Sequence, residues 1–369
     1  MKTEYVKIEK KAPDMYTIRA IRRAGEIIKA GGLVAFPTET VYGLGGNALD
    51  EKASSKIYEA KGRPSDNPLI VHICDLADLY KIADGVTDKA MAAAKKFWPG
   101  PLTMIFRKKE IVPYSTTGGL DTVAVRFPSN PVAEAFIRES GGFIAAPSAN
   151  LSGRPSPVTA EQVRQDLDGR IDMVLDGGQV GIGLESTIID MTGEIPELLR
   201  PGYITSDMLM EVFPEVARDP SLDRKSLMND ADTPAPRAPG MKYRHYAPKG
   251  ELILVEGIAE NVAAYITDGI REAKEEGRKC AVICSDESAQ MYFEDCGADV
   301  LFRSGSRDDR EQMAASLFSI LRACDDNGAD IIYAETVSDD GIGDAIMNRL
   351  RKAAGYRIAD ADHIVKDNG

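Results

Sequence analysis

The sequence predicts an α/β protein with two domains joined by a linker. Its 369 residues are more than one hydrophobic core usually serves, and 43% hydrophobic with 28% charged residues is typical of globular proteins. Short apolar runs alternate with helix-period stretches over 1–213, six prolines crowd 214–249, and a regular strand and helix rhythm fills 250–369. These patterns predict a twisted mixed sheet with helices first, and a smaller, Rossmann-like parallel α/β domain last.

The first domain is expected to begin with a helix over 18–29, which the glycine pair Gly31-Gly32 stops. Thr159 and Gln162 form a capping box that predicts another helix, ending near Leu167. Strands are predicted where short apolar runs lie between turn residues: 33–36, 69–73, 102–106, 122–127, 143–146, 173–175, 186–190 and 197–199.

Residues 214–249 are predicted to form the linker, because prolines are frequent and apolar runs are few. Its stretch PGMKYRHYAP, residues 239–248, is rich in aromatic and cationic side chains, which a passive spacer lacks. The linker is therefore also a candidate lid over an active site.

The last domain shows the rhythm of a parallel sheet. Strands are predicted at 252–255, 281–283, 300–302 and 331–333, separated by helix-length amphipathic stretches. A helix is expected to open at Gly341, with Ile346, Leu350 and Ala353 as its buried stripe. The five cysteines are scattered without metal-binding spacing, so we expect them to be small buried hydrophobic residues.

Composition excludes several classes of protein. No apolar run approaches the ~20 residues of a membrane helix and no secretion signal opens the chain, so a cytoplasmic protein without membrane contact is expected. The net charge of −13 argues against broad nucleic-acid binding. Residues 1–215 hold 25 Lys/Arg against 29 Asp/Glu, and residues 216–369 hold 20 against 29. A polyanionic ligand is therefore expected to bind locally, in the first domain.

Hydroxyl groups gather after the first predicted strand. In AFPTETVYGLGGNA, residues 35–48, Thr38, Glu39 and Thr40 stand between Pro37 and a predicted glycine-rich turn. Hydroxyls and backbone amides at the end of a strand suit a small polar ligand. A turn with a threonine N-cap has the same sequence, and the motif alone leaves both interpretations open.

Two cations stand close together in KGRPSDNPLIVHI, residues 61–73. Lys61 and Arg63 are candidates for catalytic contact with phosphates, because an arginine fork matches phosphate oxygens. A solvated basic loop is the other interpretation, and the GxxxxGK[ST] phosphate loop is absent. His72 lies inside the apolar run, as a core residue or as a neutral hydrogen-bonding group.

Arg126 lies within the predicted strand TVAVRFP, on the same face as Ala124. If both faces of the strand are covered, an unpaired guanidinium there would cost several kcal/mol. A carboxylate must therefore reach Arg126, either from the protein or from a ligand.

Other polar groups lie where predicted strands meet loops. They are Ser148, Asn150, Ser152 and Ser156 in APSANLSGRPSP, Glu185, Ser186 and Thr187 in GLESTIID, and Arg200 in LLRPG. The GxSxG and GxGxxG patterns are missing, and three histidines leave little room for a hydrolytic triad. Clustered cations without hydrolytic machinery favour an enzyme that uses ATP to adenylate a small acid.

In this order and spacing, PTETVYGLG, KGRPSDNPL, VAVRFP, PSANLSG, ESTIID and LRPG resemble the threonylcarbamoyl-AMP synthase family, whose core is a YrdC-like domain. The likeness runs over about 16–213, and PGMKYRHYAP and DGIGDAIMNRLRKAA are similar to the linker and extra domain of the long form. It implies a YrdC-like catalytic domain over 1–213, a linker over 214–249 and a Rossmann-like domain over 250–369. Ala238 departs from relatives that carry serine, which puts a linker hydroxyl contact in doubt.

The resemblance implies a nucleotidyltransferase that converts L-threonine, bicarbonate and ATP, with Mg²⁺, to L-threonylcarbamoyl-AMP and pyrophosphate. The product feeds threonylcarbamoyladenosine formation in tRNA by a separate transferase, an expected partner, with tRNA contact weak or indirect. Residues that would hold threonine are Thr38, Thr40, His72, Arg126, Ser148 and Ser186. Residues that would hold ATP are Lys61, Arg63, Asn67, Thr122, Ser148, Asn150, Ser156, Arg200 and Tyr243.

Two alternatives remain at this point. One is a module that binds double-stranded RNA or tRNA on a concave basic sheet, against which the acidic balance counts. The other is a maturation factor that shares this kind of domain and forms carbamoyl-AMP. Such factors are expected to carry zinc-binding cysteine pairs, and the sequence has none.

Overall fold

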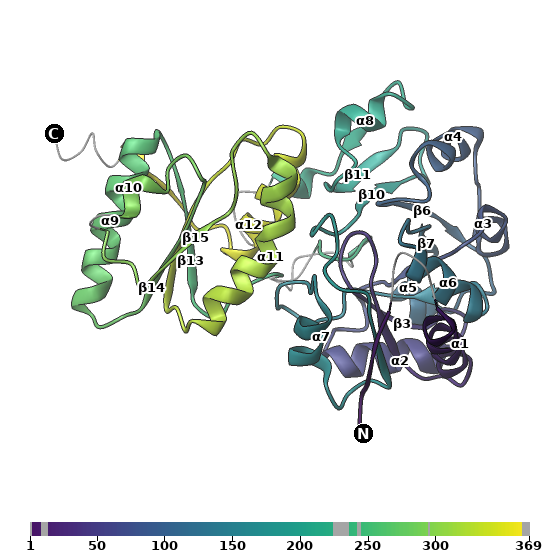
Figure 1. The fold of residues 1–369 in the computed structure, drawn as a ribbon. Coiled ribbons are helices and arrows are strands. Elements are labelled where there is room, and N and C mark those ends of the chain that lie inside the picture. Colours follow the sequence, from purple (N-terminus) through teal and green to yellow (C-terminus); the bar gives the residue numbers. More distant parts are fainter. Residues whose placement is uncertain (1, 9–13, 224–235, 242–244, 294–295, 364–369) are drawn as a thin grey trace. The chain divides into compact units, whose positions relative to one another are not determined.

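The computed structural model describes residues 2–8, 14–223, 236–241, 245–293 and 296–363. These residues form two compact units. The first takes the described residues within Met1–Ser152, Ser156–Arg224 and Met228–Tyr243, and the second those within Gly153–Pro155 and Arg244–Gly369. Figure 1 labels their helices and strands.

The first unit contains a large mixed sheet. Its strands are β1 Glu4–Lys7, β2 Val34–Phe36, β3 Gly43–Asn47, β4 Ile70–His72, β5 Ala83–Asp84, β6 Leu102–Lys108, β7 Thr122–Arg126, β8 Ile144–Ala145, β9 Met173–Asp176, β10 Thr187–Asp190, β11 Glu197–Arg200 and β12 Ala217–Arg218. They lie in the order β1-β9-β2-β3-β8-β4-β7-β6-β10-β11-β12, with β5 paired to β6. Parallel pairs such as β4 with β7 and antiparallel pairs such as β6 with β7 confirm a mixed sheet.

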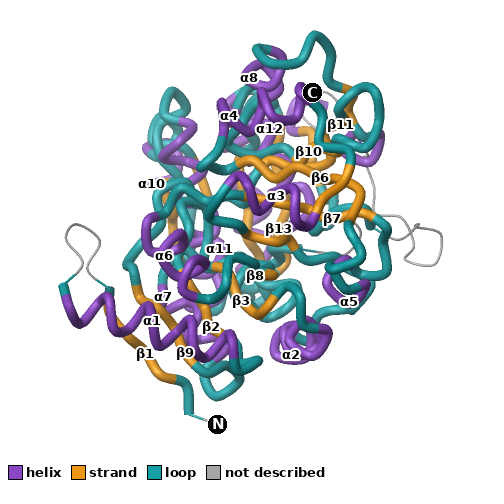
Figure 2. The backbone as a smooth tube through the Cα atoms, turned by 90° about the vertical axis from the view of Figure 1, so that its right-hand side faces the viewer, coloured by secondary structure: helices purple, strands orange, loops and turns teal. Residues whose placement is uncertain are grey.

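Helices and one 3₁₀ turn complete the first unit (Figure 2). They are α1 Met15–Lys29, α2 Glu51–Lys61, α3 Leu76–Ile82, α4 Asp88–Phe97, α5 Tyr114–Thr117, α6 Pro131–Glu139, α7 Ala160–Leu167, α8 Ser206–Met210 and the 3₁₀ turn Pro220–Asp223. Ala24 and Ile28 of α1 share one core with Phe36 of β2 and Phe136 of α6. This core supports the sheet on which the site is built.

The predicted helix start at Thr159 is confirmed. Thr159 Oγ1 accepts a hydrogen bond from Gln162 N at 3.3 Å, and α7 ends at Leu167. Gln162 Oε1 accepts a hydrogen bond from Val158 N, at 2.8 Å.

The predicted glycine-rich turn over 43–48 is wrong, because this segment forms β3, antiparallel to β2. The reason is close packing. A Cβ on Gly45 would lie 2.9 Å from Ile144 Cγ2 and 3.1 Å from a ring carbon of Phe36. Glycine therefore lets β3 run between bulky neighbours, at the cost of the apolar pattern by which a strand is recognised.

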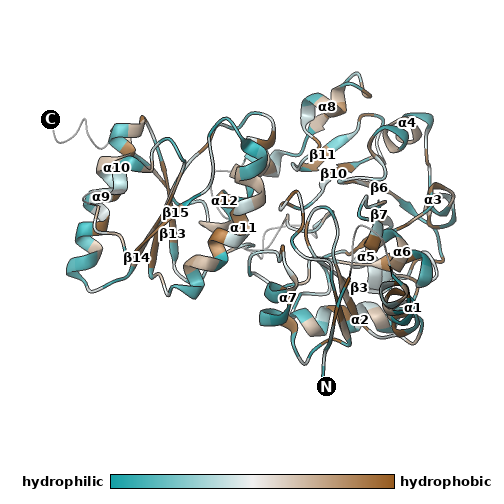
Figure 3. Ribbon diagram, viewed as in Figure 1, coloured by the Kyte–Doolittle hydropathy of each residue, from teal (hydrophilic) through white to brown (hydrophobic). Residues whose placement is uncertain are grey.

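The second unit is a parallel sheet with helices. Its strands are β13 Glu251–Glu256, β14 Cys280–Cys284, β15 Val300–Arg303, β16 Ile331–Glu335 and β17 Ile358–Asp360, in the order β15-β14-β16-β13-β17. Its helices are α9 Ala259–Glu275, α10 Gln290–Phe293, α11 Arg310–Asp326 and α12 Ile342–Ala353. All of its strand pairs are parallel, which confirms the Rossmann-like prediction. Hydrophobic strands lie between helices of mixed hydropathy (Figure 3).

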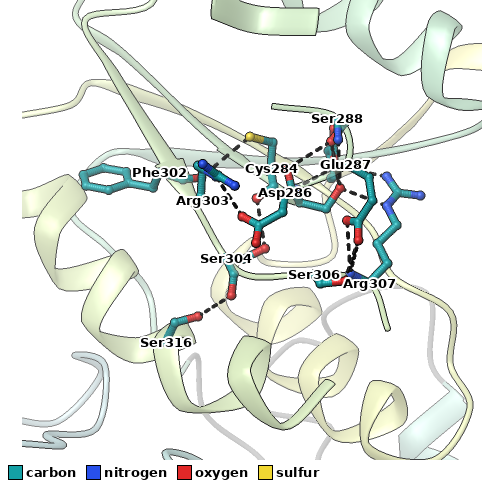
Figure 4. Close-up of polar contacts among 12 residues, drawn as sticks. Cys284, Asp286, Glu287, Ser288, Phe302, Arg303, Ser304, Ser306, Arg307 and Ser316 are labelled. Atoms are coloured by element: carbon teal, nitrogen blue, oxygen red, sulfur yellow. Dashed lines mark hydrogen bonds and ion pairs between the residues drawn. The ribbon is translucent and has the colours of Figure 1, made fainter. Parts of the chain in front are cut away.

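A dense polar network joins two loops of the second unit (Figure 4). The carboxylate of Glu287 accepts hydrogen bonds from Ser306 Oγ at 2.5 Å and from the backbone amide of Arg307 at 3.0 Å. Buried Glu335 accepts from Ser288 Oγ at 2.7 Å, Tyr292 Oη at 2.8 Å and Arg307 Nη2 at 3.0 Å. Its oxygens are saturated with donors, which marks the network as structural.

The structure also bears on the predictions about cysteines and about membrane helices. All five cysteines are buried thiols without a disulfide, as expected for small hydrophobic residues. Across the helices that the structure describes, none has the length and apolar character needed to cross a bilayer.

Candidate active site

Strand register places the main candidate residues in one row across the sheet of the first unit. His72 on β4 pairs with Arg126 on β7, which pairs with Thr103 on β6. Thr103 pairs with Ile188 on β10, and Ile188 with Arg200 on β11. Directly paired residues project from the same face, so the row aligns His72, Arg126 and Arg200 over about 19 Å, four strand spacings.

Arg126 is buried at the centre of this row. Its Nη1 donates to Thr40 Oγ1 at 2.9 Å, and Thr40 Oγ1 lies 2.8 Å from Thr38 Oγ1. Its Nη2 lies 2.7 Å from Glu39 Oε1, in an ion pair that is mostly buried. The carboxylate that the sequence requires for Arg126 therefore comes from the protein in this structure, and the residue that supplies it had no role in the sequence prediction.

His72 is held in its neutral form beside Arg126. Burial, and then the charge of Arg126, lower the pKa of His72 to about 3. Its Nδ1 lies 3.2 Å from the carbonyl oxygen of Ile70. At neutral pH the imidazole can therefore exchange hydrogen bonds with a ligand without adding charge.

We predict that His72→Gln makes the first unit less sensitive to acid. Between pH 3 and 6.5 the unfolded chain protonates His72 and the native protein does not, so stability falls as the pH drops. From pH 7 to pH 5 this loss is about 2 kcal/mol. Trp98 is the single tryptophan and is buried, so its fluorescence reports urea unfolding. This measurement should show the loss of stability from pH 7 to pH 5 in the unmodified protein and not in the variant.

His363→Gln is the control for this measurement. His363 is an exposed histidine in the second unit, so the variant should keep the full acid loss in the Trp98 transition. The same acid loss in the unmodified protein and in His72→Gln would contradict a neutral, buried His72.

Ser186 and Arg200 form the next part of the site. Ser186 Oγ lies 2.7 Å from Thr103 Oγ1, which ties it to the central row. Arg200 donates through Nε to the carbonyl of Ser186 at 3.0 Å and through Nη2 to its hydroxyl at 3.1 Å. Arg200 Nη1 also donates to the carbonyl of Pro239 in the predicted linker, at 3.3 Å.

The described linker residues 236–241 pack on the first unit. Ala238 is fully buried in an apolar cluster with Ile70 and Ala124, which lie on the same strand faces as His72 and Arg126. This environment suits a methyl group. Arg237 makes ion pairs with Asp190, Glu197 and Asp219. The predicted ATP contact Tyr243 lies outside the described residues.

Lys61 meets Ser148 and Asn150 at another part of the same unit. It is the last residue of α2, where Gly62, with a φ of 61°, turns the chain. Lys61 Nζ donates to the carbonyls of Ser148 and Asn150, both at 2.5 Å, and Ser148 Oγ donates to Asn150 Oδ1 at 2.5 Å. The structure thus brings together three residues that the resemblance assigned to one nucleotide.

The remaining predicted residues are placed individually. Arg63 is buried, and its Nη2 donates to the carbonyl of Asn67 at 3.3 Å within their shared loop. Ser156 Oγ donates to Glu185 Oε1 at 2.5 Å. Thr122 pairs with Arg107 at the opposite end of β7 from Arg126, about 13 Å along the strand.

Two family profiles and several known proteins match this chain. A Sua5/YciO/YrdC family profile, described as telomere recombination, matches residues 26–202, and a profile described as threonylcarbamoyl-AMP synthase, C-terminal domain, matches 204–355. The threonylcarbamoyl-AMP synthase of Pyrococcus abyssi is 50% identical over 92% of this chain and 95% of its own length. That of Bacillus subtilis is 47% identical over 92% and 94%.

A solved structure agrees over nearly the whole length. The crystal structure of Pyrococcus abyssi Sua5 complexed with L-threonine superposes with a TM-score of 0.89 at 47% identity, covering 97% of this chain and 99% of that one. The first profile ends at residue 202 and the second begins at 204, ten residues before the predicted linker, so both parts of the long form are present. The chain therefore belongs to the threonylcarbamoyl-AMP synthase family.

Proposed function

We propose that this protein uses ATP to convert L-threonine and bicarbonate to L-threonylcarbamoyl-AMP, with release of pyrophosphate, for threonylcarbamoyladenosine formation in tRNA. The observation that carries the proposal is the row of His72, Arg126 and Arg200 in a chain that matches threonylcarbamoyl-AMP synthases from end to end. This match favours the synthase over an RNA-binding module and over a carbamoyl-AMP-forming maturation factor.

We assign the two substrates to neighbouring groups of residues. Arg126 is the clamp for the threonine carboxylate, because its buried guanidinium already lies against a carboxylate and donates to a hydroxyl. The other threonine contacts in the proposal are Thr38, Thr40, His72, Ser148 and Ser186. The ATP contacts are Lys61, Arg63, Asn67, Thr122, Ser148, Asn150, Ser156, Arg200 and Tyr243.

The reaction demands positioning more than covalent help from the protein. The amine of threonine combines with bicarbonate to form a carbamate, and a carbamate oxygen then attacks the α-phosphorus of ATP as pyrophosphate leaves. Lys61, Arg63 and Arg200 offset the charge of the phosphates, and fixed strand ends hold both substrates in line. The groups concerned are largely buried, which protects a mixed anhydride from water.

The residues of this site are compatible with Mg²⁺ that binds together with ATP. Within the described ranges no group of three or more His, Cys, Asp or Glu side chains could hold a metal. Mg²⁺ usually keeps several waters and binds phosphates with one or two carboxylates, and Glu185 beside Ser156 is a suitable donor. When bound, the ion would neutralise phosphate charge. A cytoplasmic location and hand-over of the product to a tRNA-modifying transferase complete the proposal.

The requirement for both small substrates tests the function. ATP should be converted to pyrophosphate and an adenylate only when L-threonine and bicarbonate are both present, since the carbamate is the nucleophile. Pyrophosphate release and mass spectrometry of the product are measured in degassed buffer with and without added bicarbonate. Serine should react more slowly, because a lost methyl contact is worth about 1–3 kcal/mol. Equal turnover without bicarbonate would exclude the carbamate route.

A further inference from the structure

The ion pair between Glu39 and Arg126 leaves much of its hydrogen-bonding capacity unused. Both carboxylate oxygens of Glu39 are buried, and neither accepts a hydrogen bond from a described residue. Arg126 Nη2, 2.7 Å from Glu39 Oε1, likewise donates no hydrogen bond within the described chain, so the two groups are close but not aligned. Buried charged groups in proteins normally have their hydrogen bonds satisfied.

Two other charged clusters in this protein have their hydrogen bonds satisfied. Glu335 accepts hydrogen bonds from Ser288, Tyr292 and Arg307, so both of its oxygens are occupied. Arg237 donates hydrogen bonds to each of the three carboxylates around it. A buried nitrogen of Arg310 also lacks a hydrogen bond, but among the described residues Glu39 is the acidic side chain whose two buried oxygens both lack one. A buried carboxylate without donors, beside a cation in the candidate active site, indicates that a ligand completes the pair.

The backbone holds Glu39 in place. The amide of Ile182 donates to the carbonyl of Glu39 at 2.9 Å, and the amide of Gly183 donates to the carbonyl of Thr40 at 3.0 Å. On either side, Thr38 and Thr40 are buried and bonded to each other. The carboxylate is thus presented from a fixed position beside Arg126.

An α-amino acid matches this pair in charge and in spacing. It carries a carboxylate and an ammonium group on adjacent carbons, and the structure places a guanidinium and a carboxylate side by side. Building on the proposed function, we propose that Glu39 receives the ammonium group of L-threonine and takes up its protons as the carbamate forms.

The proton transfers balance with one carboxylate. Glu39 takes a proton from the ammonium, which frees the nitrogen lone pair. The nitrogen attacks the carbon of bicarbonate, a C–N bond forms, and hydroxide leaves as water with the proton from Glu39. The second N–H proton passes to Glu39 and then to solvent. The net change converts ammonium and bicarbonate to carbamate, water and one proton.

His72 is a weaker candidate for this role. Burial beside the charge of Arg126 keeps the imidazole neutral, so it holds a proton poorly. Its place in the row suits a hydrogen bond to the threonine hydroxyl or carboxylate.

Glu39→Gln, which keeps the shape and removes the charge, tests the inference together with a matched ligand. The ligand is 2,3-dihydroxybutyrate, in which a hydroxyl replaces the amine of threonine. Titration calorimetry should show that the unmodified protein binds threonine at least about tenfold more tightly than the analogue, and that Glu39→Gln retains less than threefold preference. At neutral pH the rate of pyrophosphate release by Glu39→Gln should fall about 100-fold or more. This rate should recover as the pH rises and free amine becomes available.

Other results of these measurements would contradict the role of Glu39 or the proposed function. An unchanged preference for threonine, or tighter threonine binding by the variant, would overturn the inference, since Glu39 would then be only a competitor for Arg126. A rate loss that rising pH does not relieve would assign Glu39 to structure. Glu39→Asp, which retracts the carboxylate, provides a second variant and should keep the preference in part. If the unmodified protein forms no threonylcarbamoyl-AMP, the proposed function fails independently of Glu39.

Discussion

Arg126→Ala is expected to weaken threonine binding by about 100-fold or more and to leave ATP binding within about threefold. Truncating one partner of a buried charge pair typically costs about 2–5 kcal/mol, and here the lost partner is the proposed clamp for the substrate carboxylate. Arg63→Ala should show the reverse, with ATP affinity reduced and threonine affinity kept. Calorimetric titration of both variants with both ligands measures the contrast.

Two controls keep this result interpretable. Arg138→Ala removes an exposed arginine from α6 and should change neither affinity. Arg126→Ala leaves Glu39 buried without its cation, so the double variant with Glu39→Gln checks that any loss is not one of folding. Parallel losses for threonine and ATP in a folded protein would make Arg126 a structural residue.

Lys61→Met is expected to lower the rate of pyrophosphate release at saturating substrates by about 10²–10³-fold. Such a loss is typical when one group that stabilises developing charge is removed. Lys61 also donates to the carbonyls of Ser148 and Asn150, so the variant loosens the loop that carries two other proposed contacts. Both effects act on the nucleotide, and ATP affinity should fall with the rate.

Lys56→Met is the matched control on the same helix. Lys56 Nζ also donates to a backbone carbonyl, that of Gly31, at 2.5 Å, but the side chain is exposed and lies apart from the candidate residues. The control should keep its activity and serve as a reference for stability. Activity of Lys61→Met within about threefold of the unmodified protein would remove Lys61 from the proposed chemistry.

Apolar runs predicted most of the strands to within two residues, because most of these runs are buried on at least one face. The strands that escaped prediction lack this signal. Strand β1 has one buried residue in four, β3 is largely glycine, β5 and β12 have two residues each, and β17 is only partly buried. Such segments become strands through their neighbours in space, and a single sequence does not state which neighbours these are.

The candidate site was likewise only partly predictable, because the sequence does not state which strands are neighbours in space. Residue types at strand ends pointed to Arg126, His72 and Arg200, but their common row depends on sheet order, in which β4 pairs with β7, and β6 with β10, although these partners are distant in sequence. Glu39 was overlooked although one signal was available. A buried arginine requires a carboxylate, and Glu39 lies between two threonines that had already been selected as candidates.

The burial of Ala238 has a consequence for how the protein is made. On the ribosome the strands of the large sheet are complete once β12 has emerged, yet the apolar cluster over Ile70 and Ile188 stays open until Ala238 follows. A shortened gene that stopped after Phe213 would expose that cluster to water and remove the Pro239 carbonyl to which Arg200 donates. The first unit therefore needs translation to continue through Met241 before its own interior is complete.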